Sequence, residues 1–387
     1  MPLSRKVDMW GGKKGDGIMM KKWALLVGAV VLVGVCLPAG ATSVPFDAPG
    51  FSYTKIIDAG STVARAPAFS PDGTKIVYTA QSAANVRSVE LYDRTTGVTT
   101  TLDSFVYGGS EDGKYFQTSP YFSSDGTKIG WTVSRAPTDY AAVYDTTTST
   151  LVQYGTVPGS GSDMGNSDFL GSGNTADQWV AWEYGVGGSV ADIFTYTLDT
   201  ATGQYVQVRN LTGTADYKEY EPDSTAAGDK ILYWSGETAA EPVDTAHVLV
   251  YDAGTDTWVK DVGFSPIVGC TWAFWSGDET EIGVSKLDTG SGYGKSDIYI
   301  YDSAGNFLFD LTGPGVGQGT DWQFLGFDFT SGPAGLGREY LFSSTADNSL
   351  GGRDVWIATA VPEPMTMAGL FMGIAGVAGY IRKRRMV

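Results

Sequence analysis

Short segments in which polar and apolar residues alternate recur along most of this chain. Between residues 68 and 97, Lys75 to Ala80 alternates polar positions with Ile76 and Tyr78, and Ser88 to Tyr92 alternates in the same way. A period of two residues is typical of a β-strand that buries one face. With the short apolar segment that precedes them, these residues predict three strands.

Two kinds of tight turn separate the predicted strands. Ser70-Pro-Asp-Gly73 and Asp93-Arg-Thr-Thr-Gly97 each combine an aspartate with a glycine, which adopts a positive φ without steric cost. The first turn returns at Ser123-Ser-Asp-Gly126 and, more loosely, at Trp275-Ser-Gly-Asp278. We expect these aspartates to accept backbone N–H hydrogen bonds rather than to bind Ca²⁺, because a Ca²⁺ loop needs several oxygen ligands at alternating positions.

The strand that leads into the second turn is repeated at nearly constant spacing. Its turn aspartates occur every 50 to 54 residues, at positions 93, 145, 199, 252 and 302, and Asp354-Val-Trp-Ile357 is a sixth, divergent copy. Repeats of about this length with four strands each are typical of propeller blades. The physical reason is that a four-stranded sheet buries both faces only when neighbouring sheets stack on it in a ring.

The repeats divide the body into six units, at residues 59–104, 105–157, 158–213, 214–262, 263–315 and 316–361. The last unit holds only three predicted strands, whereas Phe51 to Asp58 is a strand that precedes the first unit. We expect Tyr53 to Ile57 to pair with Val355 to Thr359, because this pairing supplies the missing strand and removes open edges. The sequence therefore predicts an all-β, six-bladed β-propeller over residues 42–361, closed by an N-terminal strand.

Ligand contacts are expected at one rim of this propeller. Val157 to Gly173 and Glu237 to Thr245 have the composition of turns and predict long loops, which are the usual carriers of binding determinants. Several tryptophans are candidates for stacking on sugars, although we expect most of them to pack between blades. They are Trp179, Trp182, Trp234, Trp258, Trp272, Trp275, Trp322 and Trp356.

The charge of the chain excludes two classes of partner. Its 26 Lys and Arg residues and 43 Asp and Glu residues give a net charge of −17, and residues 42–361 alone carry 16 basic and 40 acidic residues, a net of −24. Such a surface repels nucleic acid and anionic lipid. Hydrophobic and aromatic contents of 42% and 13% also argue against disorder.

The N-terminus has the features of an export signal. Residues 1–18 look like an upstream extension, and Lys21-Lys22 precedes an apolar run from Trp23 to Leu37. With the Ala39-Gly-Ala41 site that follows, this order makes a secretory signal peptide, which together with the upstream extension accounts for residues 1–41, and we predict cleavage after Ala41. A lipoprotein anchor at Cys36 is the alternative, which is disfavoured because Val35 stands where a small residue is needed.

The C-terminus has a membrane-spanning pattern. Met365 to Ile381 is an apolar run of 17 residues, the short limit for a transmembrane helix. Arg382, Lys383, Arg384 and Arg385 follow it, and we expect these basic residues to stop transfer and keep the end of the chain in the cytoplasm. A buried core helix is the alternative, disfavoured because the run abuts a basic cluster at the chain end.

The C-terminal tail also resembles a known sorting signal. Pro362-Glu363-Pro364, the apolar run and the arginine-rich end are similar to the PEP-CTERM domain, over residues 361–387 only. The resemblance implies a Gram-negative bacterium that produces exopolysaccharide, in which an exosortase-type membrane transpeptidase recognises Pro362, Glu363 and Pro364. It further implies a transient inner-membrane anchor, then processing and sorting to the cell surface, the extracellular matrix or the medium. The two prolines favour an extended, accessible recognition segment.

The body resembles the TolB-like propellers, which are related to WD-repeat proteins. The residues that carry the resemblance are Phe69-Ser-Pro-Asp-Gly-Thr-Lys-Ile-Val-Tyr78 and Phe122-Ser-Ser-Asp-Gly-Thr-Lys-Ile-Gly-Trp131, and units three to six depart from this motif. The resemblance implies a scaffold that binds other molecules. It implies no particular reaction, since the same fold hosts hydrolases and lyases.

Neither cysteine nor histidine indicates a reactive centre. Cys36 lies in the segment that we expect to be removed, so Cys270 has no disulfide partner, and we predict that it is a buried thiol. The single histidine, His247, has no second His or Cys at metal-ligand spacing, so we expect a structural or solvent-facing imidazole. No Gly-x-Ser-x-Gly elbow accompanies it, which argues against a Ser-His-Asp triad. We predict no cofactor, no metal and no catalytic residue.

Carboxylates leave one enzymatic alternative open. Glu219 with Glu221, and Asp278 with Glu279, are pairs that fit a glycosidase acid and base, but 40 acids in this body make close pairs unavoidable. We therefore predict a non-enzymatic, surface- or matrix-sorted binding protein whose partner is a polysaccharide or an envelope protein. The alternative is a secreted polysaccharide-acting hydrolase or lyase that uses carboxylates at the propeller centre.

Overall fold

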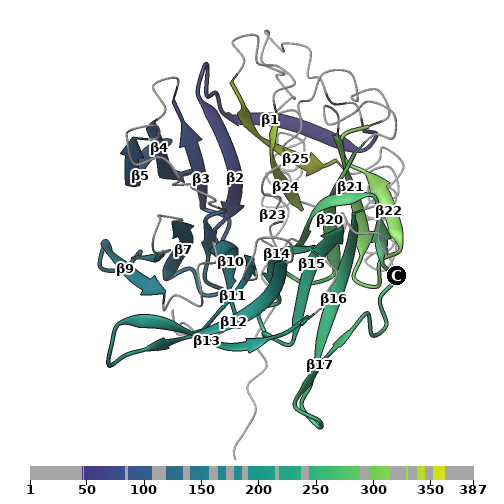
Figure 1. The fold of residues 1–387 in the computed structure, drawn as a ribbon. Coiled ribbons are helices and arrows are strands. Elements are labelled where there is room, and N and C mark those ends of the chain that lie inside the picture. Colours follow the sequence, from purple (N-terminus) through teal and green to yellow (C-terminus); the bar gives the residue numbers. More distant parts are fainter. Residues whose placement is uncertain are drawn as a thin grey trace, which may run out of the picture. The chain divides into compact units, whose positions relative to one another are not determined.

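The alternating segments form β-strands in a computed structural model of the chain (Figure 1). The chain divides into two units, Met1–Val44 and Pro45–Val387, and every residue that the structure describes lies in the second. The described residues are 46, 48–82, 86–106, 119–133, 140–156, 164–170, 178–184, 191–213, 218–236, 244–287, 296–313, 328–329, 338–344 and 352–361. Among these residues there is no helix long and apolar enough to span a membrane.

Three of the four sheets in the described part of the chain have four strands each. The first and last strands of the body share the sheet β1-β25-β24-β23, made of β1 Phe51–Ile57, β23 Asp328–Phe329, β24 Glu339–Ser344 and β25 Asp354–Ala360. A second sheet consists of β2 Val63–Phe69, β3 Lys75–Gln81, β4 Val86–Asp93 and β5 Val98–Val106. A third consists of β19 Cys270–Trp275, β20 Glu281–Leu287, β21 Ser296–Asp302 and β22 Phe307–Asp310.

The fourth sheet has 13 strands, which fall into three antiparallel sets. One set is β6 Tyr121–Phe122, β7 Lys128–Val133, β8 Tyr140–Asp145 and β9 Thr150–Thr156, and the next is β10 Met164–Phe169, β11 Gln178–Tyr184, β12 Ala191–Asp199 and β13 Gln204–Asn210. The third is β14 Lys218–Ser224, β15 Lys230–Gly236, β16 Thr245–Asp252 and β17 Thr257–Lys260, with β18 Ile267–Val268 beside β16. Parallel pairings of only one or two residues, β12 with β14 and β9 with β13, join these sets.

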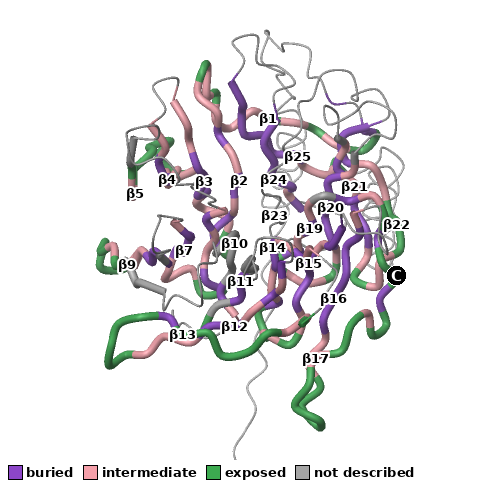
Figure 2. Tube along the Cα trace, viewed as in Figure 1, coloured by how far each residue is buried: buried purple, intermediate pink, exposed green. Residues whose placement is uncertain are grey.

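The inner strands are buried on both faces, not on one. In β3, Ile76 and Tyr78 pack on the sheet that holds β24 and β25, whereas Val77 packs against Ile129 and Trp131 of β7. The expectation of half-buried strands is therefore wrong here, because a sheet lies on each side. Figure 2 shows the resulting gradient, in which β16 is buried along most of its length and the outer strands β13 and β17 are largely exposed.

Clusters of buried apolar side chains fill each space between consecutive sets. They join the β2–β5 sheet to β6–β9, then β6–β9 to β10–β13, β10–β13 to β14–β17, and β14–β18 to β19–β22. Two further clusters join β19–β22 to the sheet of β1 and β23–β25, and that sheet back to β2–β5. This stacking of antiparallel sheets, each covered by its neighbours, makes the body an all-β propeller.

The predicted pairing between the two ends of the body is confirmed. β1 runs antiparallel to β25, with Tyr53 opposite Ala358, Thr54 opposite Ile357 and Lys55 opposite Trp356. The backbone also connects β25 to β2, because the Ala64 N–H donates to the Arg353 carbonyl at 3.0 Å and the Arg353 N–H donates to Thr62 at 3.0 Å. The last sheet is therefore hydrogen-bonded to residues from the beginning of the body.

One predicted loop is wrong in its middle. Of the segment from Val157 to Gly173, residues 164–169 form β10, which pairs with β11. The sequence of β10, Met-Gly-Asn-Ser-Asp-Phe, is poor in β-branched and aromatic residues, so its composition gives little strand signal. Its pairing with β11 and its contacts with β14 and β7 decide the conformation instead.

The turn aspartates behave as expected. The carboxylate Oδ1 of Asp72 accepts hydrogen bonds from the Ser70 hydroxyl at 2.6 Å and the Thr74 N–H at 3.0 Å, and Asp125 makes the same contacts with Ser123 and Thr127. Those bonds favour the ionised form, and they lower the pKa of Asp72 from 3.8 to about 2. The five repeated aspartates at 93, 145, 199, 252 and 302 also accept backbone N–H groups of their own turns, and their pKa values are lowered.

These turns predict a specific loss of stability in acid. Because the pKa of Asp72 is lower in the folded state, its contribution is complete above about pH 4 and is lost as the pH falls toward about 2. Asp72→Asn should lower the free energy of unfolding at pH 7, and the difference from the parent should shrink between pH 4 and pH 2. Urea unfolding at several pH values measures this, with Asp125→Asn as a matched second variant. A difference that is unchanged at pH 2 would contradict the assignment.

Candidate functional site

Antiparallel pairing gives each set of strands two different ends. At one, which we name the turn end, tight turns such as 70–73 and 93–97 join the first strand to the second and the third to the fourth. At the other, the connection end, the second strand joins the third and each set joins the next. Most of the longer connecting segments therefore belong to the connection end, although residues 170–177 and 330–338 join a first strand to a second at the turn end. Longer connecting segments are where binding residues usually lie.

The first strand of several sets is interrupted by a β-bulge. The register shifts between Arg65 and Ala68 in β2, between Tyr220 and Asp223 in β14, and likewise in β10 and β19. In β2 and β14 the residue before a proline has a positive φ, 46° at Ala66 and 54° at Glu221. A positive φ is unfavourable for alanine and glutamate, and a residue before proline normally adopts an extended conformation. The backbone is therefore strained at both residues, and the surrounding packing must stabilise it.

Bulges re-aim side chains and are enriched next to functional sites. Here they occur at equivalent places in four first strands, and the residues that precede them lie toward the connection end. We therefore take this end of the first strands as the candidate site. Its described charged residues are Arg65 of β2 and Lys218, Glu219 and Glu221 of β14.

The carboxylates of β14 were candidates for an acid and a base. Glu219 and Glu221 are both buried, with 1% and 9% of their surface exposed, and the Trp234 indole N–H donates to Glu221 Oε2 at 3.1 Å. The Tyr220 and Trp234 rings lie 4.6 Å apart beside this bond. Asp223 in turn accepts the backbone N–H of Trp275, from the next set. Glu221 and Asp223 thus fix neighbouring strands, which is a structural use of a carboxylate.

The other predicted pair, Asp278 and Glu279, lies at the turn end. Asp278 accepts from the Ser276 hydroxyl at 2.8 Å and contacts Arg338, and Glu279 accepts the backbone N–H of Ala226 at 2.9 Å. The two carboxylates therefore face different partners on either side of their set. The structure does not bring them together with Glu219 and Glu221 on one strand end.

The single histidine is buried and paired. His247 is 4% exposed, its Nδ1 lies 2.8 Å from Asp261 Oδ2, and its ring packs on Tyr233 at 5.6 Å. Asp261 also accepts the backbone N–H of Val248 through Oδ1. Of the two readings that the sequence left open, the structural one is confirmed and the solvent-facing one is wrong, since β16 is covered on this face.

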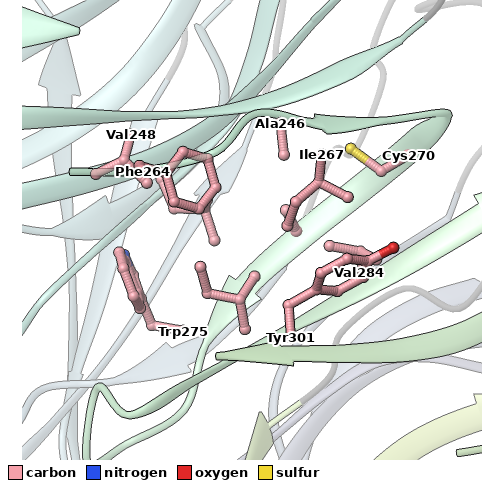
Figure 3. Close-up of a cluster of buried hydrophobic side chains, with 11 residues drawn as sticks. Ala246, Val248, Phe264, Ile267, Cys270, Trp275, Val284 and Tyr301 are labelled. Atoms are coloured by element: carbon pink, nitrogen blue, oxygen red, sulfur yellow. The ribbon is translucent and has the colours of Figure 1, made fainter. Parts of the chain in front are cut away.

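Cys270 is also buried, as expected. Figure 3 shows it in the cluster between β16 and the β19–β22 sheet, together with Phe264, Trp275 and Tyr301. Its side chain is fully inaccessible, and burial, with a smaller effect from Asp244, raises the pKa of the thiol to about 12. A thiol in this setting is protonated at neutral pH.

Tryptophans divide between packing and partial exposure. Trp275 and Trp356 are 6% and 3% exposed and belong to clusters between sets, which confirms the expected packing role for these two. Trp234, Trp258 and Trp272 are half-buried. The side chains of Trp179, Trp182 and Trp322 lie outside the described residues.

The predicted sorting and processing residues also lie outside the described part of the chain. These are Ala39, Ala41, Pro362, Glu363, Pro364, Arg382, Lys383, Arg384 and Arg385, together with the apolar run 365–381. They stay predictions. Within the described ranges, no group of three or more His, Cys, Asp or Glu residues could hold a metal ion.

Comparisons with known proteins give similar folds and no assigned family. No family model matches the sequence, and no curated protein matches it. Solved structures that are similar include TolB from Acinetobacter baumannii, at 14% identity over 75% of this chain and 64% of that chain, with a TM-score of 0.42. An oligogalacturonate lyase from Vibrio parahaemolyticus matches at 12% identity over 82% of this chain and 99% of the lyase, with a TM-score of 0.46.

A third similar structure is the β-propeller domain of the Trilobed protease from Pyrococcus furiosus, at 14% identity over 76% of this chain and 78% of that domain, with a TM-score of 0.43. The propeller fold of the present chain follows from its own strand pairing and packing. These similarities indicate no function for it.

Sequence reasoning missed the bulges, although a signal for them was present. The dipeptides Ala66-Pro67 and Glu221-Pro222 coincide with the bulges of β2 and β14, whereas the bulges of β10 and β19 contain no proline and Ser119-Pro120 precedes the regularly paired β6. A proline inside a strand cannot donate a hydrogen bond to its neighbour, so it favours a bulge over regular pairing. Arg65 was missed for a different reason, because no sequence pattern shows which arginines lack a carboxylate partner.

Proposed function

We propose that the chain is an exported, non-enzymatic binding protein whose body is a six-bladed propeller and whose ligand, a polysaccharide or an envelope protein, binds at the connection end. The observation that carries the proposal is the set of bulges in four first strands, two of which, in β2 and β14, hold a residue in a strained backbone conformation toward that end. A rigid platform of this kind lowers the entropic cost of binding.

The number of blades is supported by the packing. Within the described part of the body, six clusters of buried side chains each lie between two sets of strands, and one of them joins the last set to the first. The spacing of the repeated turn aspartates supports the same number. A ring of six accounts for all of these clusters.

The use of the described carboxylates favours binding over hydrolysis. A glycosidase needs two carboxyl groups facing one substrate, about 5 to 9.5 Å apart. Here Glu221 is occupied by the indole of Trp234 and Asp223 by the backbone of Trp275. An enzyme that used Glu221 and Asp223 as its two carboxylates would therefore need both of these contacts to be broken when substrate binds.

The binding proposal predicts glycan recognition without cleavage. The purified chain should bind a subset of acidic or neutral glycans on an array, and no new reducing ends should appear when the same glycans are incubated with it. Release of reducing ends that Glu221→Gln abolishes would favour the enzymatic alternative. Absence of binding to any glycan would point to an envelope protein as the partner and would contradict the polysaccharide proposal.

We propose in addition that the chain is sorted by an exosortase-type transpeptidase at Pro362-Glu363-Pro364. The support is the order of the sequence features, in which a signal peptide, a proline-flanked motif, an apolar run and a basic end follow one another. The structure has a matching feature, since β25 ends at Ala360 and the exposed Val361 leads directly into the motif. The motif therefore follows the last described strand closely in the sequence.

This sorting proposal predicts a defined mature form. Mass spectrometry of surface-exposed protein from the native bacterium should find chains that begin at Thr42 and end near Pro364. Changing Glu363 to Ala should leave the tail attached and the protein in the inner membrane. Intact Val387 on surface-exposed material would count against processing.

A further inference from the structure

Arg65 occupies an unusual position in the first strand of its set. It lies immediately before the bulge of β2 and is opposite Thr79 of β3. Arg87 of β4 is opposite Gln81 of β3, two residues further toward the connection end. Because directly paired residues and residues two apart share a face of a sheet, Arg65, Thr79, Gln81 and Arg87 lie on one face.

That face is apolar toward the turn end and polar toward the connection end. Val77, Val89 and Leu91 cover its turn-end half and pack against Trp131 of the next set. Arg65 and Arg87 continue the same face where the connecting segments of the two sets begin. The two guanidinium groups therefore lie at the connection-end edge of the space between the first two sets.

Among the described residues, Arg65 has no carboxylate partner. Its side chain is half-buried, its Nε is buried without a hydrogen-bond acceptor, and the charge that acts on it is that of Arg87. Burial first, and Arg87 second, lower the pKa of the Arg65 guanidinium. Both effects oppose a positive charge at this position.

Three other arginines of the described body each have a carboxylate partner. Arg94 forms a two-bond pair with Glu339 at 2.8 and 2.9 Å, Arg209 pairs with Asp256 at 3.1 Å, and Arg338 contacts Asp278 and Glu281. Carboxylates are abundant, with 40 in residues 42–361. A shortage of acidic residues therefore does not explain why Arg65 lies beside Arg87 and not beside a carboxylate of the described body.

We propose that Arg65 binds a carboxylate group of an acidic polysaccharide, a chain that contains uronic acid residues, at the connection-end edge between the first two sets of strands. This inference rests on the proposed binding function and names its ligand class. The guanidinium fork matches a carboxylate with two parallel hydrogen bonds, and a bound anion removes the unfavourable interaction with Arg87. Gln81, on the same face, supplies a polar group beside the arginine, and the Thr79 hydroxyl donates to the Arg65 carbonyl at 3.2 Å.

A charged ligand also fits the rest of the body. With a net charge of −24, the body repels polyanions at long range, so binding needs a local positive site. Such a site selects anionic sugars that reach it and discriminates against neutral ones, because only the anion offsets the burial of the arginine. Binding should weaken as salt is added.

The test compares one glycan in two charge states. Binding of a galacturonic acid tetramer to the full-length chain in mild detergent is measured by calorimetry, beside the methyl-esterified tetramer, which has lost its charges, and inorganic phosphate. The variants are Arg65→Gln, Arg65→Lys and, as a control with the same change of charge, Arg209→Gln on the outer strand β13, where Arg209 is 41% exposed and pairs with Asp256. Thermal unfolding of each variant shows whether it is folded.

The acidic tetramer should bind, and the ester and phosphate should bind at least about tenfold more weakly. Arg65→Gln should weaken binding by about 10- to 100-fold, the value expected for losing a hydrogen-bonded charge. Arg65→Lys should be intermediate, and Arg209→Gln should match the parent. Equal binding by a folded Arg65→Gln variant, or by the ester, overturns this inference and leaves the proposed binding function standing. Binding of phosphate as tight as the tetramer would show a general anion site and overturn the assignment to uronic acids. No binding of any of the three probes also overturns it.

Discussion

The structure depends on covering both faces of every sheet. A strand such as β3 carries apolar side chains on both faces, so a single set of four strands would expose an apolar face to water even if its other face were covered. Burial of apolar surface contributes about 25 cal/mol per Å², and the chain obtains it by stacking each set on the next. A linear stack would leave one face of the first set and one face of the last set uncovered. The last sheet, which includes β1, packs on the first set, so these two faces cover each other.

Closure therefore concentrates interactions at the last sheet. β1 supplies its outer strand, and Phe46, Phe342 and Trp356 pack with rings about 5 Å apart in the cluster that joins it to β21. Ion pairs act at the turn end on both sides of this sheet, Arg94 with Glu339 toward the first set and Arg338 with Asp278 and Glu281 toward the fifth. Arg338 is 1% exposed, so removing its partners would leave a buried charge at a cost of about 3 to 5 kcal/mol. The Arg94 pair is more exposed, and it should contribute less.

Part of this account follows from the sequence alone. The period-2 segments and the evenly spaced aspartates predicted the strands, the turns and the pairing of Tyr53 to Ile57 with Val355 to Thr359, because each depends on local chemistry or on spacing. β10 escaped prediction because its pairing, not its residues, makes it a strand. The burial of both faces, the pairing of His247 with Asp261 and the isolation of Arg65 depend on which sheets meet, which one sequence does not reveal.

The candidate site, too, has features that the sequence indicates and features that only the structure reveals. Proline positions would have indicated the bulges of β2 and β14, since proline cannot continue a regular ladder, whereas the bulges of β10 and β19 contain no proline. The use of Glu221 as an acceptor for Trp234 could not have been anticipated, because an acidic residue in a strand has the same signature whether it binds a neighbour or a substrate. Function therefore has to be argued from contacts, and these direct the further inference to Arg65, which has no carboxylate partner among the described residues, and not to the carboxylates.

Disulfide cross-linking of β1 to β25 tests most directly the claim that the two ends of the body share a sheet. Ser52 of β1 lies opposite Thr359 of β25, so Ser52→Cys with Thr359→Cys, in a chain that also carries Cys36→Ser and Cys270→Ala, should form a disulfide on mild oxidation. The bond would link residues 307 positions apart and raise the thermal unfolding temperature, while Ser52→Cys with Thr99→Cys should form none. If the first pair does not form a bond in the folded protein, or forms it without stabilising the body, the two ends do not share a sheet and the account is contradicted.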